Sequence, residues 1–578
     1  MRRLFRKNFQ KKSSDRGVEF DEILLDASNI SKLNQARLEG QLERPLSSRS
    51  IFGIGLVFCL VVGWFIFETF SLQIIEGSEH RSVSENNSLN RTVLIAERGV
   101  IFDRTGEKLV WNEFDPADEY DFAVRAYTGQ VGLGQVLGYV SYPQKDRNEL
   151  FWRTEYLGRS GVEAVFNETL TGTNGERIIE TDARGYIIGE HAVVQPEPGD
   201  AITVSIDATL TQAMYDIIAT SSVQAGFRSG AGAIMDVTSG ELLALTSYPS
   251  YDPAVMAAGQ PADQIAEWNA DKRFPFLNKA VGGVYTPGSV VKPFVSYGAL
   301  VEGVVTADTL IESTGSITIP NPYHPENPSR FADWRVHGVM DLRQAIAFSS
   351  NVYMYYISGG FRDITGLGID RMNGYFHKFG WGEKTGVNLQ HEQAGVVPSP
   401  DWKEQVFGDT WRLGDTYLTS IGQFGFQATP IQVLRAYAAL ANGGTLLIPH
   451  INYGKQSEGR DLALDKNALR EVQQGMRMAV NYDGGTARPL ERRDVAIAAK
   501  SGTAEVGIDN QYVNSWVAGY WPYEDPQYAF VIMMDRAPRE NQLGATRIMG
   551  DLVEWMTEHT PHYMFKNMDE IAMDDIVD

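Results

Sequence analysis

The longest uninterrupted hydrophobic segment lies near the N-terminus, where residues 50–67 carry no charged side chain. A helix rises about 1.5 Å per residue, so this segment spans roughly 27 Å, about the thickness of a bilayer core. It has no polar stripe, which a buried helix of a soluble domain would show, and Glu68 follows where a signal peptide would have small residues. The pattern predicts one membrane-spanning anchor, which we place at residues 50–72.

The charges beside this segment predict its orientation. Seven of the first sixteen residues are basic and one is acidic, and basic flanks stay on the cytoplasmic side. We expect residues 1–49 to be a largely flexible cytoplasmic tail, with a short amphipathic helix at 28–42, and the residues after the anchor to be exported across the membrane. Residues 561–578 are expected to form an acidic C-terminal tail, in which 568–578 is solvated and disordered.

Residues 73–204 are rich in short strand-like segments and turns, which predicts a β-rich domain. Arg98, Asp103, Arg104 and Glu163 are expected to form an ion-pair cluster that ties its strands together. Such buried networks are more often structural than chemical, so we assign this region no chemistry.

Residues 205–560 alternate between helical and strand periodicity. Residues 313–336 are rich in Pro and Asn and predict an irregular connection. An early hairpin and three late strands, with helices between and after them, imply one antiparallel sheet covered by helices, an α+β fold. The predicted helices lie at 208–223 (with Asp207 as N-cap), from Thr429-Pro430 to Gly443-Gly444, at 466–480 and at 545–559, and the strands at 230–236, 241–249, 495–506, 512–521 and 528–536.

Candidate chemistry begins in Tyr285-Thr-Pro-Gly-Ser-Val-Val-Lys292, where turn formers precede a helical segment. Residues three apart on a helix are neighbours, so Ser289 and Lys292 are expected to lie side by side. A serine hydroxyl becomes a good nucleophile only when a base takes its proton, and a lysine amine can be that base only if its pKa is lowered. Alone, S-x-x-K is a weak motif that also occurs on solvated surfaces.

Two further motifs follow at suitable distances. Ser349-Ser350-Asn351 is an S-x-N within the apolar-periodic stretch 342–357, and Lys500-Ser501-Gly502-Thr503 closes the apolar run 495–499. The trio S-x-x-K, S-x-N and K-[ST]-G is a recognised set in penicillin-binding proteins and class A β-lactamases. Its three members in this chain order are far more specific than any one of them.

On these motifs the chain resembles a class B penicillin-binding protein, a serine D,D-transpeptidase. The resemblance extends over about residues 90–540 and includes four segments of the β-rich region, at 98–106, 158–163, 170–175 and 182–185. It implies the penicillin-recognising fold, with a five-stranded antiparallel sheet at 205–560, on a pedestal domain at 73–204. One departure is Gly422-Gln423-Phe424-Gly425, where the family usually has G-Q-G, so this loop is expected to be displaced.

The resemblance also implies roles. Ser289 would attack the carbonyl of a stem peptide ending in D-Ala-D-Ala, Lys292 would take its proton, Ser349 would relay a proton to the leaving amine, and Asn351 would hold Lys292 and the substrate. Lys500 would act as a second cation, the hydroxyls of Ser501 and Thr503 would bind the terminal carboxylate, and Gly502 would keep the strand edge uncrowded. Implied partners are stem peptides, β-lactams and a SEDS-family glycosyltransferase.

Composition narrows the alternatives. The net charge of −22 disfavours nucleic-acid binding, the nine His show no metal-ligand spacing, and neither a metal nor a cofactor is predicted. The sole cysteine, Cys59, lies in the hydrophobic segment, so the exported part has no thiol.

A membrane-bound β-lactam sensor and a β-lactamase share the trio of motifs. The sensor should carry several membrane spans or a signalling domain, whereas this sequence predicts one span, and a β-lactamase is usually smaller than this chain and soluble. A scaffold that activates the glycosyltransferase and a division-type enzyme stay open beside the favoured elongation type (similar to penicillin-binding protein 2).

Overall fold

The computed structural model describes residues 48–78, 89–114, 121–147, 151–181, 187–321, 325–541 and 543–565. It divides into two units, residues 1–89 and 90–578, which are described separately. The expectations for the tail at 1–47, including the helix at 28–42, for the motif at 182–185 and for the acidic residues 566–578 lie outside the described residues.

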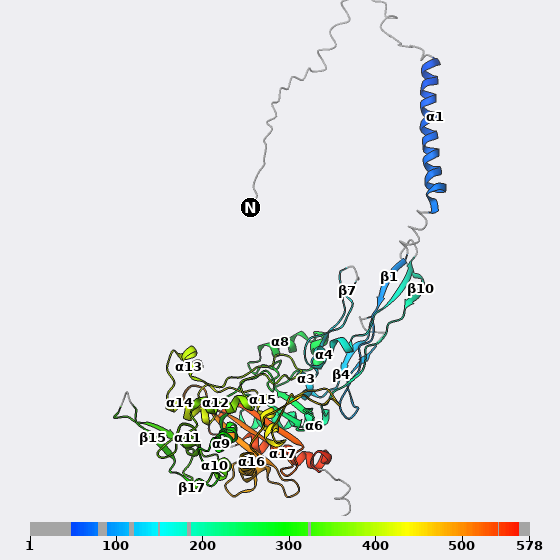
Figure 1. Ribbon diagram of the computed structural model, residues 1–578. Coiled ribbons are helices and arrows are strands. Elements are labelled where there is room, and N and C mark those ends of the chain that lie inside the picture. Colours follow the sequence, from blue (N-terminus) through cyan, green and yellow to red (C-terminus); the bar gives the residue numbers. More distant parts are fainter. Residues whose placement is uncertain are drawn as a thin grey trace, which may run out of the picture. The chain divides into compact units, whose positions relative to one another are not determined.

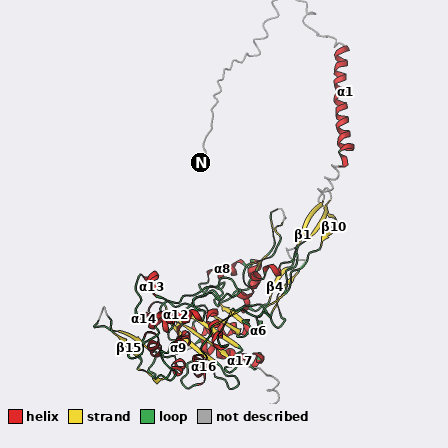
Figure 2. Cartoon of the chain, viewed as in Figure 1, coloured by secondary structure: helices red, strands yellow, loops and turns green. Residues whose placement is uncertain are grey.

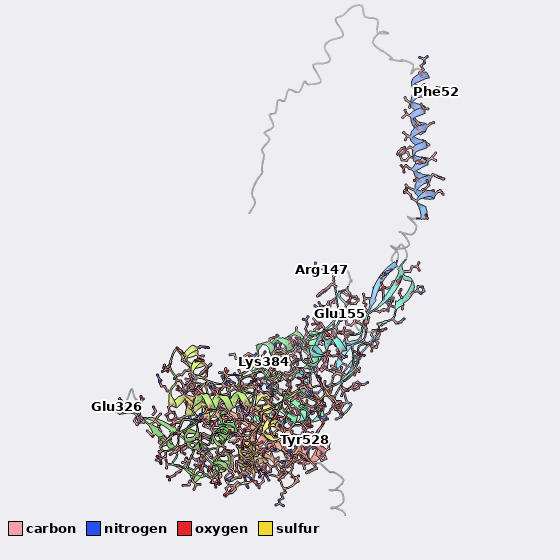
Figure 3. All side chains as sticks on the ribbon, in the orientation of Figure 1. Phe52, Arg147, Glu155, Glu326, Lys384 and Tyr528 are labelled. Atoms are coloured by element: carbon pink, nitrogen blue, oxygen red, sulfur yellow. The ribbon has the colours of Figure 1, made fainter. Side chains whose placement is uncertain are left out.

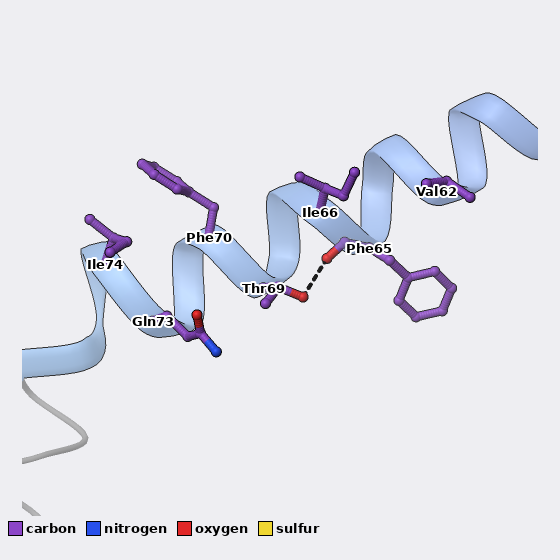
Figure 4. A pocket seen from close by; sticks show the side chains of 7 residues that line it. All are labelled: Val62, Phe65, Ile66, Thr69, Phe70, Gln73 and Ile74. Atoms are coloured by element: carbon purple, nitrogen blue, oxygen red, sulfur yellow. Dashed lines mark hydrogen bonds between the residues drawn. The ribbon is translucent and has the colours of Figure 1, made fainter.

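The first unit contains one long apolar helix. Helix α1 (Ser48–Phe70) continues into a π-helical turn, η4 (Ser71–Ile75), and residues 51–75 are long and apolar enough to cross a membrane, with a mean hydropathy of 2.3. Its side chains project on all sides (Figure 3). The Thr69 hydroxyl donates to the Phe65 carbonyl at 2.7 Å (Figure 4), so this polar group is satisfied within the helix. The helix is consistent with a single-pass membrane anchor.

The part of the second unit before residue 205 is built mainly from short strands, as predicted (Figure 1). One sheet has the order β1-β9-β10 and another the order β11-β2-β3-β4. The strands are β1 (Leu89–Leu94), β2 (Ile101–Phe102), β3 (Lys108–Glu113), β4 (Val124–Tyr127), β5 (Val140–Ser141), β6 (Gln144–Lys145), β7 (Phe151–Arg153), β8 (Leu157–Gly158), β9 (Gly175–Thr181), β10 (Ile187–Val194) and β11 (Ile202–Thr203), and the helices are α3 (Gly134–Leu137), α4 (Gly161–Val165) and α5 (Asn167–Leu170).

A buried ion cluster centred on Glu163 joins these elements. Its carboxylate accepts from Arg98 Nε at 2.6 Å and from Arg125 Nε at 2.9 Å, and all three side chains are fully buried. The predicted pair of Arg98 and Glu163 is present. Arg125, which the sequence analysis did not include, takes the place expected for Asp103 and Arg104.

Asp103 and Arg104 instead contact residues that follow β11. The Asp103 carboxylate accepts from the backbone N–H of Ala208 at 3.2 Å. Arg104 lies 3.7 Å from Glu241 and donates to the Ser205 carbonyl at 3.3 Å. The expected four-residue cluster is therefore wrong in composition, because the four side chains serve two separate junctions.

The centre of the second unit is a five-stranded antiparallel sheet of order β13-β12-β22-β21-β20, as predicted. Its strands lie among helices in Figure 2. Both end strands of this order, β13 and β20, are edges, and β20 carries the Lys500–Thr503 motif. The strands are β12 (Ser229–Asp236), β13 (Leu242–Tyr248), β20 (Ala498–Val506), β21 (Tyr512–Trp521) and β22 (Tyr528–Pro538).

Both faces of this sheet are buried by helices. Successive side chains of a strand point to opposite faces, and in β22 Val531 and Met533 join the cluster that contains α15 (Pro430–Ala441). Phe530 and Ile532 join the other cluster, with α6 (Ala208–Ala225) and α17 (Ala545–His559). Asp207 caps α6 by accepting from Leu210 N at 2.9 Å, as predicted.

The other helices surround this core. They are α7 (Pro253–Ala258), α8 (Ala262–Ala270), α9 (Lys292–Val301), α10 (Leu342–Phe348), α11 (Asn351–Gly359), α12 (Ile369–Lys378), α13 (Pro400–Phe407), α14 (Leu413–Ser420) and α16 (Lys466–Asn481). Residues 313–336 are not simply irregular, as was expected. They include the hairpin of β15 (Ser316–Ile319) and β16 (Ser329–Ala332), next to the pair β14 (Ile311–Ser313) and β17 (Gly338–Met340).

We predict that Glu163→Gln destabilises the protein by about 3–5 kcal/mol, because it leaves the charges of Arg98 and Arg125 buried without a counter-ion. The matched control is Glu190→Gln, which removes a partly exposed pair with Arg177 and is expected to cost about 1 kcal/mol or less. Denaturant unfolding of the detergent-solubilised chain measures both. Equal losses of stability would contradict the assignment.

Candidate active site

The turn that carries Ser289 is pressed against the edge of the sheet. Ser289 lies in a 3₁₀ turn, η6 (Gly288–Val291), that leads directly into α9, as the sequence predicts. Gly288 has a φ of +59°, and a Cβ there would lie 2.7 Å from the Thr503 carbonyl oxygen. The Gly288 N–H donates to the Gly422 carbonyl at 3.0 Å. Only a glycine allows this approach, which brings Ser289 to β20.

The amine of Lys292 is completely buried and is held by the Ser349–Asn351 turn. It donates to the Ser349 carbonyl at 2.7 Å, to Ser349 Oγ at 3.2 Å and to Asn351 Oδ1 at 2.7 Å. Burial lowers the pKa of Lys292 from 10.5 to about 7, against the opposing effect of the Asp333 charge. The structure thus brings together Ser289's turn, Lys292, Ser349 and Asn351.

The Ser349–Asn351 turn exists because the apolar stretch 342–357 breaks into two helices. Ser349 ends α10 in the left-handed conformation, with a φ of +58°. Ser350 then caps α11 by accepting from Tyr353 N at 3.3 Å. The left-handed residue turns the chain so that the carbonyl and hydroxyl of Ser349 both face the amine of Lys292.

Asp333, which the sequence analysis did not single out, holds this turn from behind. Its carboxylate accepts from Ser350 Oγ at 2.7 Å, from Asn351 N at 2.9 Å and from Val352 N at 3.1 Å, and His337 Nε2 lies 3.4 Å away. Burial raises the pKa of Asp333, but hydrogen bonds from His337, Asn351 and Ser350 and the charge of Lys292 together lower it well below its usual range. No sequence signal distinguishes this aspartate within a segment rich in Pro and Asn.

The second lysine lies in the edge strand. Lys500 is fully buried and donates to the Ser501 carbonyl at 2.8 Å. Burial lowers its pKa well below the usual value, and the neighbouring charge of Lys292 lowers it further. Ser501 Oγ donates to Thr486 Oγ1 at 2.7 Å. Thr486, which the predicted site also did not include, therefore lies beside Ser501 in the lining of the site.

Gly502 lines the groove and also packs against the turn that carries Ser289. A Cβ at this position would lie 2.9 Å from both the Pro287 carbonyl oxygen and Val290 Cγ1. The glycine therefore makes room for this turn, in addition to the role at the strand edge that the sequence predicts.

These groups open onto one groove of about 1130 Å³. Ser289, Ser349, Asn351, Ser501 and Thr503 all line it, whereas Lys292 and Lys500 lie beneath its surface. The other lining residues are Arg330, Phe331, Ala332, Asp333, Trp334, Tyr355, Leu418, Ile421, Gln423, Phe424, Thr486, Gly502, Glu505, Asn510, Val513, Ser515, Trp516, Arg539, Asn541, Leu543, Gly544 and Thr546.

The loop at Phe424 is tied to the turn that carries Ser289. The Gly422 carbonyl accepts from the Gly288 N–H at 3.0 Å. Phe424 has a φ of +57°, and its ring packs edge-on against Trp402 and Trp411, with centroids 6.0 and 5.6 Å apart. Aromatic packing stabilises a backbone conformation that otherwise favours glycine.

Comparison with known proteins agrees with this architecture. Residues 230–554, more than half of the chain, match the family described as "Penicillin binding protein transpeptidase domain", and residues 120–204 match "Penicillin-binding Protein dimerisation domain". Peptidoglycan D,D-transpeptidase MrdA of Acinetobacter baumannii is 31% identical over 411 residues, which are 67% of this chain and 58% of that protein. MrdA of Escherichia coli is 29% identical over 471 residues, 75% of this chain and 71% of that protein.

Solved structures lead to the same family. The complex of penicillin-binding protein PBP2 with MreC from Helicobacter pylori aligns with a TM-score of 0.67 at 26% identity, covering 81% of this chain and 99% of that one. A peptidoglycan synthase complex described as coordinating polymerization and crosslinking aligns with a TM-score of 0.66 at 26% identity, covering 87% and 97%. Fold, site and relatives agree: the chain belongs to the penicillin-binding proteins, as a class B member similar to MrdA.

Proposed function

We propose that this chain is a peptidoglycan D,D-transpeptidase that cross-links stem peptides through an acyl-enzyme on Ser289. The observation that carries the proposal is the buried Lys292 amine. Its pKa is about 7, and the Ser349–Asn351 turn holds it by hydrogen bonds. Lys292 directly follows the turn that carries Ser289, which lines the groove. An amine with this pKa is substantially unprotonated near neutral pH, which a general base requires. The similarity to MrdA favours the elongation type, with a role in cell shape, over the division type.

The first half-reaction forms the ester. Lys292 takes the proton of Ser289 Oγ as this oxygen bonds to the carbonyl carbon of the penultimate D-Ala. Backbone N–H groups of Ser289 and Thr503 face the developing oxyanion; the close approach of Gly288 to Thr503 supports this pairing. Ser349 Oγ gives its proton to the leaving D-Ala amine as the peptide bond breaks and takes the one that Lys292 holds, so that Lys292 is neutral again. Ser501 and Thr503, beside the buried Lys500, bind the terminal carboxylate.

The second half-reaction transfers the peptide. An acceptor amine attacks the Ser289 ester, the new amide bond forms, and the proton that the amine loses returns through Lys292 to Ser289 Oγ. The edge position of β20 supports binding of an extended donor along it. Penicillins acylate the same serine because their strained amide takes the place of the D-Ala-D-Ala bond.

Asp333 acts as a positioning residue in this scheme. Its hydrogen bonds to Ser350, Asn351 and Val352 fix the turn whose oxygens hold the Lys292 amine. A misplacement of about 1 Å in such a turn is enough to cost roughly 10²-fold in rate. Asp333 also places a negative charge near Lys292, which favours the protonated amine.

We further propose the topology and partners that the family implies. Residues 1–49 are cytoplasmic, α1 anchors the chain in the inner membrane, and residues 73–204 and 205–560 form an exported pedestal and the catalytic domain. A SEDS-family glycosyltransferase is the proposed partner of the pedestal, supported by the similarity to a synthase complex that joins polymerization to crosslinking. A purely scaffolding role is disfavoured by the intact site.

The first test is mass spectrometry of the detergent-solubilised chain after incubation with a penicillin. We expect one stable adduct on the peptide that contains Ser289, and none in Ser289→Ala, which removes the nucleophile. Rapid hydrolysis of the drug without an adduct would indicate a β-lactamase. If neither adduct nor hydrolysis appears, the scaffold hypothesis replaces the enzyme.

The second prediction concerns pH. Only neutral Lys292 accepts a proton, so the acylation rate constant should rise about tenfold per pH unit below the pKa of about 7 and level off above it. Lys292→Arg keeps a permanent cation and should lower the rate by about 10²–10⁴-fold. Stopped-flow acylation by a fluorescent penicillin between pH 5.5 and 9 measures both; a flat profile through pH 7 in the unmodified chain would refute a titrating base.

The third prediction concerns Asp333→Asn. This change removes the negative charge that raises the pKa of Lys292 and weakens the clamp on the Ser349–Asn351 turn. Acylation should therefore fall by about 10²-fold at its plateau, while the midpoint of its pH profile moves below that of the unmodified chain. The control is Asp308→Asn, in an exposed pair with Arg343. A fall in rate with an unchanged midpoint would mean that Asp333 has only a structural role.

A further inference from the structure

An ion pair lines the groove in addition to the groups assigned above. Arg539 Nη2 lies 2.8 Å from Glu505 Oε1, and both side chains line the same groove as Ser289. They are about half exposed, 57% for Arg539 and 42% for Glu505. Such an exposed pair contributes little to stability, typically 0–1 kcal/mol, so each charge is available to a ligand at small cost.

Glu505 continues the row of groove-lining side chains that Ser501 and Thr503 begin. Alternate residues of a strand face the same side, and in β20 the side chains of Lys500 and Ala504 are buried while those of Ser501, Thr503 and Glu505 line the groove. Glu505 is two residues beyond Thr503 along the edge strand, which is about 7 Å at 3.4 Å per residue.

The proposed reaction fixes which part of the donor reaches Glu505. The terminal carboxylate lies at Ser501 and the attacked carbonyl at Ser289 and Thr503, so the rest of the donor extends along β20 toward its C-terminal end. One residue of an extended chain covers about 3.4 Å. The residue before D-Ala-D-Ala is therefore the one whose long side chain reaches Glu505 and Arg539.

We propose that the Glu505–Arg539 pair binds a zwitterionic side chain, with an ammonium and a carboxylate on the same carbon, at the donor residue before D-Ala-D-Ala. The inference rests on the proposed transpeptidase function. Glu505 accepts from the ammonium, and the planar guanidinium of Arg539 binds the carboxylate with two parallel hydrogen bonds. A diamino-diacid residue carries both groups, whereas a lysine offers only the ammonium and leaves Arg539 without a carboxylate.

The test measures binding in the Ser289→Ala chain, which cannot turn the peptide over. Two pentapeptides are compared by calorimetry on the full-length, detergent-solubilised protein: one with meso-diaminopimelate and one with lysine before D-Ala-D-Ala. We expect the diaminopimelate peptide to bind at least about tenfold more tightly. Adding Arg539→Gln should remove this preference and leave the lysine peptide unchanged, and adding Glu505→Gln should weaken both peptides.

Matched controls separate the outcomes. Arg547→Gln removes an arginine from another exposed pair, with Asp551, and should change neither affinity. Equal affinity for the two peptides, or an equal loss of both in Arg539→Gln, would overturn the proposal. Failure of the proposed function is detected separately, since it would leave the chain with native Ser289 without a penicillin adduct.

Discussion

The whole site depends on burying a lysine amine away from water. Removing an ammonium from water disfavours its charged form, and Lys292 lies fully buried with its hydrogen bonds directed at the oxygens of a single turn. These oxygens keep the amine in place in either protonation state, since a neutral amine still donates two hydrogens. A solvated lysine next to a serine would have the same sequence motif and little basicity at neutral pH.

This constraint explains several features that look unrelated in the sequence. The left-handed Ser349 directs both of its oxygens to one amine, and the clamp from Asp333 stabilises that conformation. The glycines at 288 and 502 allow a helix start and a sheet edge to approach so closely that a Cβ at either position would lie 2.7–2.9 Å from a backbone oxygen of the other segment. Each feature costs backbone freedom or strain, and each is offset by contacts from a different element.

Much of this arrangement was predictable from sequence because it depends on local signals. Strand alternation, the Asp207 cap and the three motifs gave the five-stranded sheet and the residues around Lys292. What escaped prediction depends on contacts between distant segments: Asp333 acts on residues 17–19 positions later, and Arg125 replaces two predicted partners of Glu163. The departure at Phe424 was visible in sequence, but the aromatic rings that hold it were not, because Trp402 comes from α13 and Trp411 from the segment before α14.

The contact of Asp103 with the first turn of α6 has a mechanical consequence. The carboxylate belongs to the segment after β2, and the N–H that it binds begins the helix that covers one face of the catalytic sheet. Because β2 also pairs in parallel with β11 just before that helix, a load on the strands before residue 205 reaches the sheet through two short connections. A force applied to the strands before residue 205 is therefore transmitted to the sheet that carries the active site.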